Sequence, residues 1–185
     1  MDGNRDNDPI VTNPTDAEWD ATLDDSAGVL RAFQCILTDA AQALVEEFRA
    51  ERDRSYKRAC SQRVGRPDQL ATLWSPLHLR MRTRDKAGVV VSLTLSWQLV
   101  FSHGPRQLRQ RKFEHIPTRN GSSDYDPFRL YQLARDHERE LVVAIERRAA
   151  AIRKAWASVV SMRGAHRNLR TSRTSLTAPR STDPS

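Results

Sequence analysis

The chain has 185 residues, enough for one domain and too few for two of ordinary size, and its net charge is +7. Hydrophobic residues make up 38% and charged residues 29%, so we expect a small core with flexible ends. The longest apolar run, residues 89–101, is interrupted by polar residues and is much shorter than the ~20 residues that cross a bilayer. No membrane span is therefore expected. The acidic start MDGNRDND lacks the basic and apolar parts of a signal peptide, so we expect a cytoplasmic protein.

Positive charge is concentrated in the middle of the chain. Residues 1–25 contain eight Asp or Glu and one Arg, whereas residues 49–119 contain sixteen Lys or Arg against five Asp or Glu. Such a segment attracts polyanions, and nucleic acid is the commonest polyanion in a cytoplasm. Arginine outnumbers lysine 26 to 4, an excess that a GC-rich genome alone could produce. The clustering of the charges is therefore a stronger indication of DNA binding than their number.

The first expected element is a long helix. Apolar residues recur three or four apart from Leu30 to Phe48, and they include Phe33, which is the spacing of one helical face. Residues 24–26 suit the start of this helix, basic residues follow towards its end, and Gly65 and Pro67 would terminate it. Residues 1–25 and 164–185 lack apolar periodicity, which predicts an acidic and a basic disordered tail around a single domain, residues 26–163.

Three strands are expected next. In residues 77–82 leucine and methionine alternate with polar residues, and after the turn RDKAG residues 89–101 alternate in the same way, which predicts a hairpin. Residues 108–117 form a plausible third strand. Its register stays open because Leu108, Phe113 and Ile116 do not share one parity.

A second long helix is expected at the end of the domain. Asp126 and Pro127 are a helix start signal, and the helix would run to about Arg163. It carries a heptad seam that could pack against the first helix or against another chain: Val142, Ile145, Ala149, Ile152, Trp156 and Val159. The expected fold is thus α+β, with a long N-terminal helix, a small three-stranded antiparallel sheet, a long C-terminal helix and disordered tails.

The candidate DNA contacts are basic residues of the sheet and of the first helix. The polar face of the hairpin would expose Arg80 and Arg82 with Ser96 and Gln98, and a two-stranded ribbon fits the major groove. An ordinary solvated sheet face alternates in the same way, and a basic third strand could serve only to block aggregation. Basic residues late in the first helix could contact phosphates or simply favour the helix dipole. The full set is Lys57, Arg58, Arg80, Arg82, Arg106, Arg109, Arg111, Lys112 and Arg119.

We expect no catalytic, cofactor or metal site. The sequence has no phosphate-binding loop, dinucleotide-binding motif or zinc motif, and its five histidines are scattered. Residues 136–140, DHERE, do not have the spacing of a zinc-binding helix face. Cys35 and Cys60 lie too far apart on the first helix to form a disulfide. The protein is therefore not expected to be an enzyme.

Residues 97 to about 163 resemble the MobI family of auxiliary mobilisation proteins. In that family a strand with a Trp leads to a His-Ile turn, a Tyr and a helix of the type W-E-x-x-L-V…E…F-A-x-I-R. The matching residues here are Trp97, His115, Ile116, Pro117, Tyr125, Glu140, Leu141, Glu146, Ala151, Ile152 and Arg153. His137 stands where the family has Trp, and Ala149 or Ala150 stands near the expected Phe.

The resemblance implies a DNA-binding accessory of conjugative transfer, encoded on an integrative conjugative element or a related plasmid. Such a protein would act at the origin of transfer with a separate relaxase or other transfer proteins. The alternative is an interaction or scaffold protein, antitoxin-like or regulatory, that offers its C-terminal helix seam to a partner. That seam would also allow a homo-oligomer.

Overall fold

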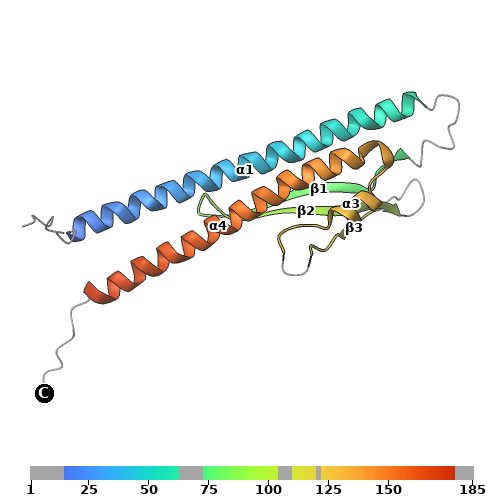
Figure 1. Ribbon diagram of the computed structural model, residues 1–185. Coiled ribbons are helices and arrows are strands. Elements are labelled where there is room, and N and C mark those ends of the chain that lie inside the picture. The colour runs from blue at the N-terminus through green and yellow to red at the C-terminus, as the bar shows by residue number, and fades with distance from the viewer. Residues whose placement is uncertain (1–14, 63–72, 104–109, 120–121, 178–185) are drawn as a thin grey trace, which may run out of the picture.

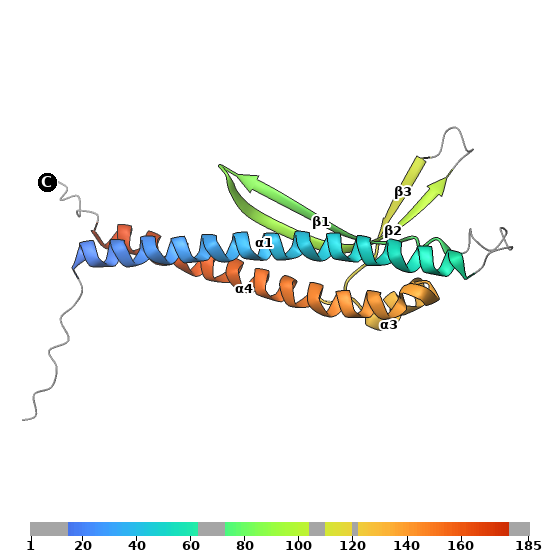
Figure 2. The ribbon, with the colours of Figure 1, turned by 90° about the horizontal axis from the view of Figure 1, so that it is seen from above.

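The computed structural model describes residues 15–62, 73–103, 110–119 and 122–177. Figure 1 shows two long helices side by side, and Figure 2 shows the sheet on one side of this helix pair. The chain therefore has the expected α+β fold. In chain order the elements are α1 (Asp16–Ser61), β1 (Leu77–Lys86), β2 (Val89–His103), β3 (Gln110–His115), α3 (Pro127–Leu133), the 3-10 helix η1 (Asp136–Glu138) and α4 (Arg139–Thr177).

Helix α1 begins well before the predicted position. Thr15 caps it: the Thr15 side chain accepts a hydrogen bond from the Glu18 amide at 3.3 Å, and the Glu18 carboxylate accepts one from the Thr15 amide at 2.6 Å. These hydrogen bonds hold the pKa of Glu18 below its ordinary value. The prediction of a tail over residues 1–25 is wrong for residues 16–25, because this capping box starts the helix before the apolar stripe begins. Residues 1–14 lie outside the described residues.

Helix α4 ends later than predicted. Residues 164–177 are helical, although they were expected to belong to a tail. The basic end of α4 lies beside the acidic start of α1, where Arg173 pairs with Asp16 at 3.1 Å and Arg170 pairs with Asp24 at 3.4 Å. These ion pairs connect the two helices beyond their apolar stripes. Residues 178–185 lie outside the described part of the chain.

The predicted continuous helix from Pro127 to Arg163 is wrong. Asp126 does cap a helix, accepting a hydrogen bond from the Phe128 amide at 3.0 Å, but this helix is α3 and it stops at Leu133. The backbone is extended at Ala134 and Arg135. The Arg135 amide donates to the side chain of Glu138 at 3.1 Å, a hydrogen bond that starts a new helical segment before α4.

The core lies between the sheet and the helix pair. Phe48 of α1 meets Trp97 of β2 edge to face, with ring centroids 5.0 Å apart. The heptad seam of α4 is buried apart from the half-buried Ile152, and α4 packs along α1. The seam therefore acts inside the chain, which leaves the scaffold alternative without its proposed surface. On α1, Phe33 is exposed and Gln34 is buried in its place, contrary to the predicted stripe.

The sheet has the order β1-β2-β3 and is antiparallel throughout. The hairpin turns at Ala87 and Gly88, which both have positive φ, as a two-residue turn of type I′ requires. Pairing of β2 with β3 runs only from Gln98 opposite His115 to His103 opposite Gln110. The rest of β2, residues 89–97, has β1 on one side and, among the described residues, no strand on the other.

None of the helices in the described ranges is both long enough and apolar enough for a membrane span. Both cysteines lie on α1 and are free, as expected from their spacing.

Candidate nucleic-acid interface

The hairpin divides its side chains between two faces as predicted. Leu77 and Leu79 of β1 are buried in the core, and His78, Arg80, Arg82 and Arg84 alternate with them on the opposite face. On β2 this opposite face carries Ser92, Thr94, Ser96 and Gln98. Ser96 and Gln98 are buried, contrary to expectation: in the register Gln98 lies between His78 of β1 and His115 of β3, and Ser96 lies beside Arg80.

Strand β3 adds a further arginine and an aromatic ring to this face. Phe113 pairs with Val100 and Arg111 pairs with Ser102, which places both residues on the same side as Arg80 by alternation along β2. The Arg80 guanidinium carbon lies 5.8 Å from the centroid of the Phe113 ring. We call this surface the basic sheet face and define it as His78, Arg80, Arg82, Arg84, Arg111 and Phe113.

The arginines of the basic sheet face are not neutralised by carboxylates. Within the part of the chain that the structure describes, none of Arg80, Arg82, Arg84 and Arg111 forms an ion pair. Arginines elsewhere do, for example Arg148 with Glu47 at 2.5 Å. The basic sheet face therefore keeps its positive charge and suits a polyanion.

Helix α1 adds positive charge beside His78. The Arg52 guanidinium donates to the Leu77 carbonyl at 3.3 Å and lies 3.2 Å from His78 Nδ1. Burial, together with the charges of Arg52, Arg49 and Arg111, lowers the pKa of His78 to about 4, and Asp53 opposes this shift only in part. His78 is therefore neutral at pH 7 within a cationic surrounding.

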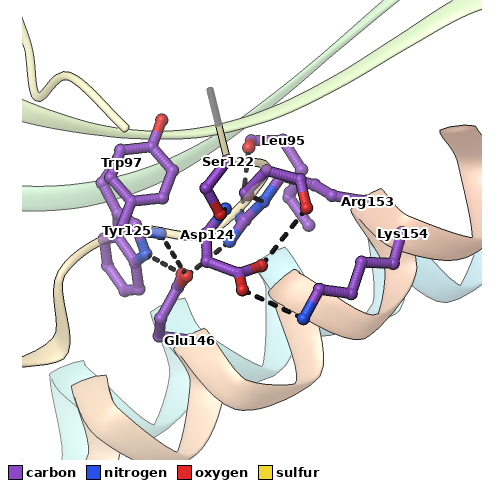
Figure 3. A network of polar contacts seen from close by, with 9 residues as sticks. Leu95, Trp97, Ser122, Asp124, Tyr125, Glu146, Arg153 and Lys154 are labelled. Carbon is purple, nitrogen blue, oxygen red and sulfur yellow. Dashed lines mark hydrogen bonds and ion pairs between the residues drawn. The ribbon is translucent and has the colours of Figure 1, made fainter. Parts of the chain in front are cut away.

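A buried polar network anchors β2 to α4 (Figure 3). Its centre is Glu146 of α4, which is 2% exposed. The Glu146 carboxylate accepts a hydrogen bond from the Trp97 indole at 2.7 Å and one from the Tyr125 amide at 3.0 Å. It also pairs with the guanidinium of Arg153. Each carboxylate oxygen thus has a donor, as a buried charge requires.

Arg153 connects this network to the loop before α3. Its guanidinium donates to the Leu95 carbonyl at 3.4 Å, and its central carbon lies 4.9 Å from the centroid of the Tyr125 ring. Beside it Lys154 pairs with Asp124 at 2.9 Å and holds the pKa of that carboxyl below its usual value (Figure 3). Burial raises the pKa of Tyr125, so its phenol stays protonated. The charged groups of the network are paired with one another, which suits a structural anchor.

The network is built from residues that carry the family resemblance: Trp97, Tyr125, Glu146 and Arg153. A scan against protein-family models matches residues 37–167 to the model described as MobI protein. The chain belongs to the MobI family. Membership associates it with mobilisation and its machinery. A search of curated proteins and a search of solved structures found no significant match.

In this MobI-family protein the structure gathers some of the predicted DNA contacts and separates others. Arg80, Arg82 and Arg111 share the basic sheet face. Lys112 pairs with Phe101 and so lies on the opposite face of the sheet, a placement that the open register could not supply. The remaining candidates lie elsewhere: Lys57 and Arg58 are exposed on α1, Arg119 is exposed in the turn after β3, and Arg106 and Arg109 fall outside the described residues.

The sequence does not single out Arg84 or Phe113 as members of the basic sheet face, nor Arg52 as a residue beside it. From the sequence Phe113 is an apolar strand position of open register, yet in the structure it is 53% exposed beside Arg80. The sequence leaves the basic residues late in the first helix as phosphate contacts or partners of the helix dipole, whereas Arg52 lies 3.2 Å from His78 Nδ1 of β1. Within the described ranges, no group of three or more His, Cys, Asp or Glu side chains could hold a metal ion.

Proposed function

We propose that this MobI-family protein binds DNA at the origin of transfer through the basic sheet face, as a non-enzymatic cytoplasmic accessory that works with a separate relaxase. The observation that carries the proposal is the set of unpaired arginines on one face, Arg80, Arg82, Arg84 and Arg111. Free guanidinium groups on one surface bind phosphates and release counterions, which is the main source of affinity for DNA.

The geometry of β1 suits a phosphate backbone. Arg80, Arg82 and Arg84 recur at every second residue, so they are spaced about 7 Å apart along the strand. The neighbouring positions on β2 carry the hydroxyl groups of Ser92 and Thr94, which can donate to phosphate oxygens or base edges. A ribbon of two strands has the width that the major groove admits.

Phe113 favours a contact with an unpaired base. An exposed aromatic ring next to a guanidinium is the combination on which single-stranded bases stack. A protein that assists strand processing meets both duplex and single-stranded DNA at the same site. We therefore propose that Phe113 receives a base where the duplex opens.

The nicking reaction itself is assigned to the relaxase. Glu146 pairs with Arg153 in the buried network and Asp124 pairs with Lys154 beside it, so these groups supply structure instead of a free acid or base. This supports an accessory role that requires neither a cofactor nor a metal.

Binding measured at two salt concentrations tests the proposal. The full-length protein is titrated against duplex carrying the transfer origin, random duplex and single-stranded DNA at 50 and 200 mM salt. If the face engages about four phosphates, raising the salt should weaken binding by about 100-fold. The triple variant Arg80→Ala, Arg82→Ala, Arg84→Ala should bind more weakly and lose most of this salt dependence.

A matched control uses arginines that are exposed elsewhere. The double variant Arg129→Ala, Arg147→Ala removes two exposed arginines of α3 and α4 and should retain wild-type affinity. Wild-type binding by the triple variant, or an affinity that does not change with salt, would contradict the proposal.

A further inference from the structure

A groove lies between the hairpin and the two long helices. Its larger part has a volume of about 650 Å³ and is lined by Val89 and Val91 of β2, Val160 and Gly164 of α4, and Gln34 of α1. A second cavity, of about 270 Å³, follows along the same two elements, between Leu93 and Leu95 of β2 and Ile152 and Trp156 of α4. We call the two together the edge groove. It contains none of the arginines of the basic sheet face.

One wall of the edge groove is the edge of β2, where, within the described part of the chain, the backbone of Leu93 is unused although its neighbours on this side are bonded. The Trp97 carbonyl accepts a hydrogen bond from the Ile116 amide at 3.2 Å, and the Leu95 carbonyl accepts one from Arg153 at 3.4 Å. Alternate residues of a strand direct their amides and carbonyls to the same side, so the backbone groups of Leu93 face this side too. No strand pairs with them among the described residues. Such an edge accepts an extended peptide as an added strand.

Gln34 supplies a second and independent indication. Its side chain is 2% exposed and lines the groove, and both amide atoms lack a hydrogen-bond partner within the described residues. A buried amide without partners is costly, and it presents one donor group and one acceptor. A peptide backbone offers the complementary acceptor and donor. A phosphate would use only the donor, so the amide favours a peptide over a phosphate.

Basic residues that line the groove favour acidic side chains in the bound peptide. Arg31, Lys86, Arg163 and Arg167 line the groove, and none of them forms an ion pair with another described residue. Between them lie apolar surfaces, including the exposed side chain of Val160. The matching occupant has acidic groups for the cationic rim and apolar groups for these surfaces.

We propose that the edge groove binds an extended acidic and apolar segment of a partner protein, which adds to β2 as a fourth strand. The wall formed by α4 runs from Ile152 to Arg167, a length of about 22 Å, which corresponds to about seven residues of strand. Main-chain hydrogen bonds to β2 hold the segment, Gln34 bonds to its backbone, and the cationic rim selects acidic side chains.

The test measures fluorescence anisotropy of a labelled peptide added to the full-length protein. The probe is a seven-residue peptide of alternating valine and glutamate, compared with the same peptide carrying lysine in place of glutamate. We expect the acidic peptide to bind at least tenfold more tightly than the basic one. On binding, the Leu93 amide should exchange its hydrogen more slowly, because it gains a bond to the added strand.

Two variants test the location. A Cβ at Gly164 would meet nothing within 4 Å, so Gly164→Trp should place its ring in the groove and weaken binding at least tenfold. Gly28→Trp is the matched control, since this glycine of α1 also has open space but does not line the groove. Arg163→Glu should weaken binding of the acidic peptide and strengthen that of the basic one, which serves as a second test if Gly164→Trp folds poorly.

Several results would overturn the proposal. Equal binding of the two peptides, or no binding of either, would contradict the proposal that the occupant is an acidic segment. Wild-type peptide binding by both Gly164→Trp and Arg163→Glu would show that the peptide does not bind in the groove. If random duplex DNA displaces the peptide and itself loses affinity in Gly164→Trp, the groove is a DNA site. If light scattering shows a dimer that Gly164→Trp separates, the occupant is a second copy of the chain.

Discussion

Arg80 of β1 and Phe113 of β3 meet across the central strand, with the Arg80 guanidinium carbon 5.8 Å from the centroid of the ring. Side chains from the two outer strands thus meet on one exposed face of the sheet. A guanidinium within about 6 Å of a ring centroid is attracted to the face of the ring, which favours the two groups side by side. This pair can therefore present a cation to a phosphate and a ring to the adjoining base.

The first prediction concerns Phe113. Phe113→Ala should weaken binding of single-stranded DNA by about tenfold, since stacking of a base on an aromatic ring contributes about 1–3 kcal/mol. Binding of closed duplex should change much less, because its bases are already stacked on one another. Anisotropy with a single-stranded oligonucleotide and with its duplex measures both effects.

Phe101 provides the control for this variant. It is 40% exposed, close to the 53% of Phe113, but its partner in the register is Lys112, which places it on the other face of the sheet. Phe101→Ala should leave DNA affinity unchanged. Equal losses in the two variants would indicate a general effect on the sheet and would contradict base stacking on Phe113.

The second prediction concerns pH. In the folded chain the pKa of His78 is about 4, below its ordinary value of 6.5, because of burial and the charges of Arg52, Arg49 and Arg111. Between pH 6.5 and 4 the unfolded chain therefore binds a proton that the folded chain does not, so stability falls as the pH falls through this window. His78→Gln, which cannot be protonated there, should flatten the decline in urea unfolding experiments at pH 7 and 4.5.

DNA should change this titration. A phosphate near His78 favours the protonated imidazole, so binding should raise the pKa of His78 and take up a proton. Affinity for duplex should then increase as the pH falls from 7 to 5 in the wild type, and increase less in His78→Gln. Identical pH profiles of the two proteins would place the phosphates away from His78.

Local sequence signals predicted the strands and one helix start correctly. Alternation at Leu77 and Leu79 identified β1 and its buried face, and Asp126 before a proline identified the start of α3. The start of α1 had a signal that was overlooked, because Thr15 and Glu18 have the spacing of a capping box. A prediction from apolar periodicity starts the helix only where the apolar stripe begins, whereas a capping box can start a helix without such a stripe.

Which residues belong to the basic sheet face depends on strand pairing and helix packing, and local sequence patterns do not encode these. The face on which Lys112 lies follows from the pairing of β2 with β3, and a shift of one residue would exchange it with Arg111. Arg52 reaches His78 only because α1 passes beside the end of β1. Clustered charge thus predicts a polyanion-binding surface, whereas register and helix packing determine which arginines share it.

The third prediction concerns the buried pair Glu146 and Arg153. Glu146→Leu should lower the free energy of unfolding by about 3–5 kcal/mol, because it leaves the guanidinium of Arg153 without its buried partner. The double variant Glu146→Leu, Arg153→Met should recover part of the loss, since it removes both charges. Urea unfolding of the two variants, set against Arg153→Met alone, gives the coupling free energy. Additive losses would mean that the pair is not coupled.

The last prediction separates stability from binding at Gln34. The amide of Gln34 is buried and lacks a hydrogen-bond partner within the described residues, and leaving such a group unsatisfied costs about 1–3 kcal/mol. Gln34→Met keeps the length of the side chain and removes the amide, so the free energy of unfolding should rise by about 1–2 kcal/mol. The same variant should bind the acidic peptide more weakly, because the segment loses its partner in the groove. Gln132→Met at an exposed position of α3 is the control and should change stability by less than about 0.5 kcal/mol. A loss of stability in Gln34→Met would mean that the amide is already satisfied in the free protein, and the case for a peptide partner would then depend on the strand edge and the cationic rim alone.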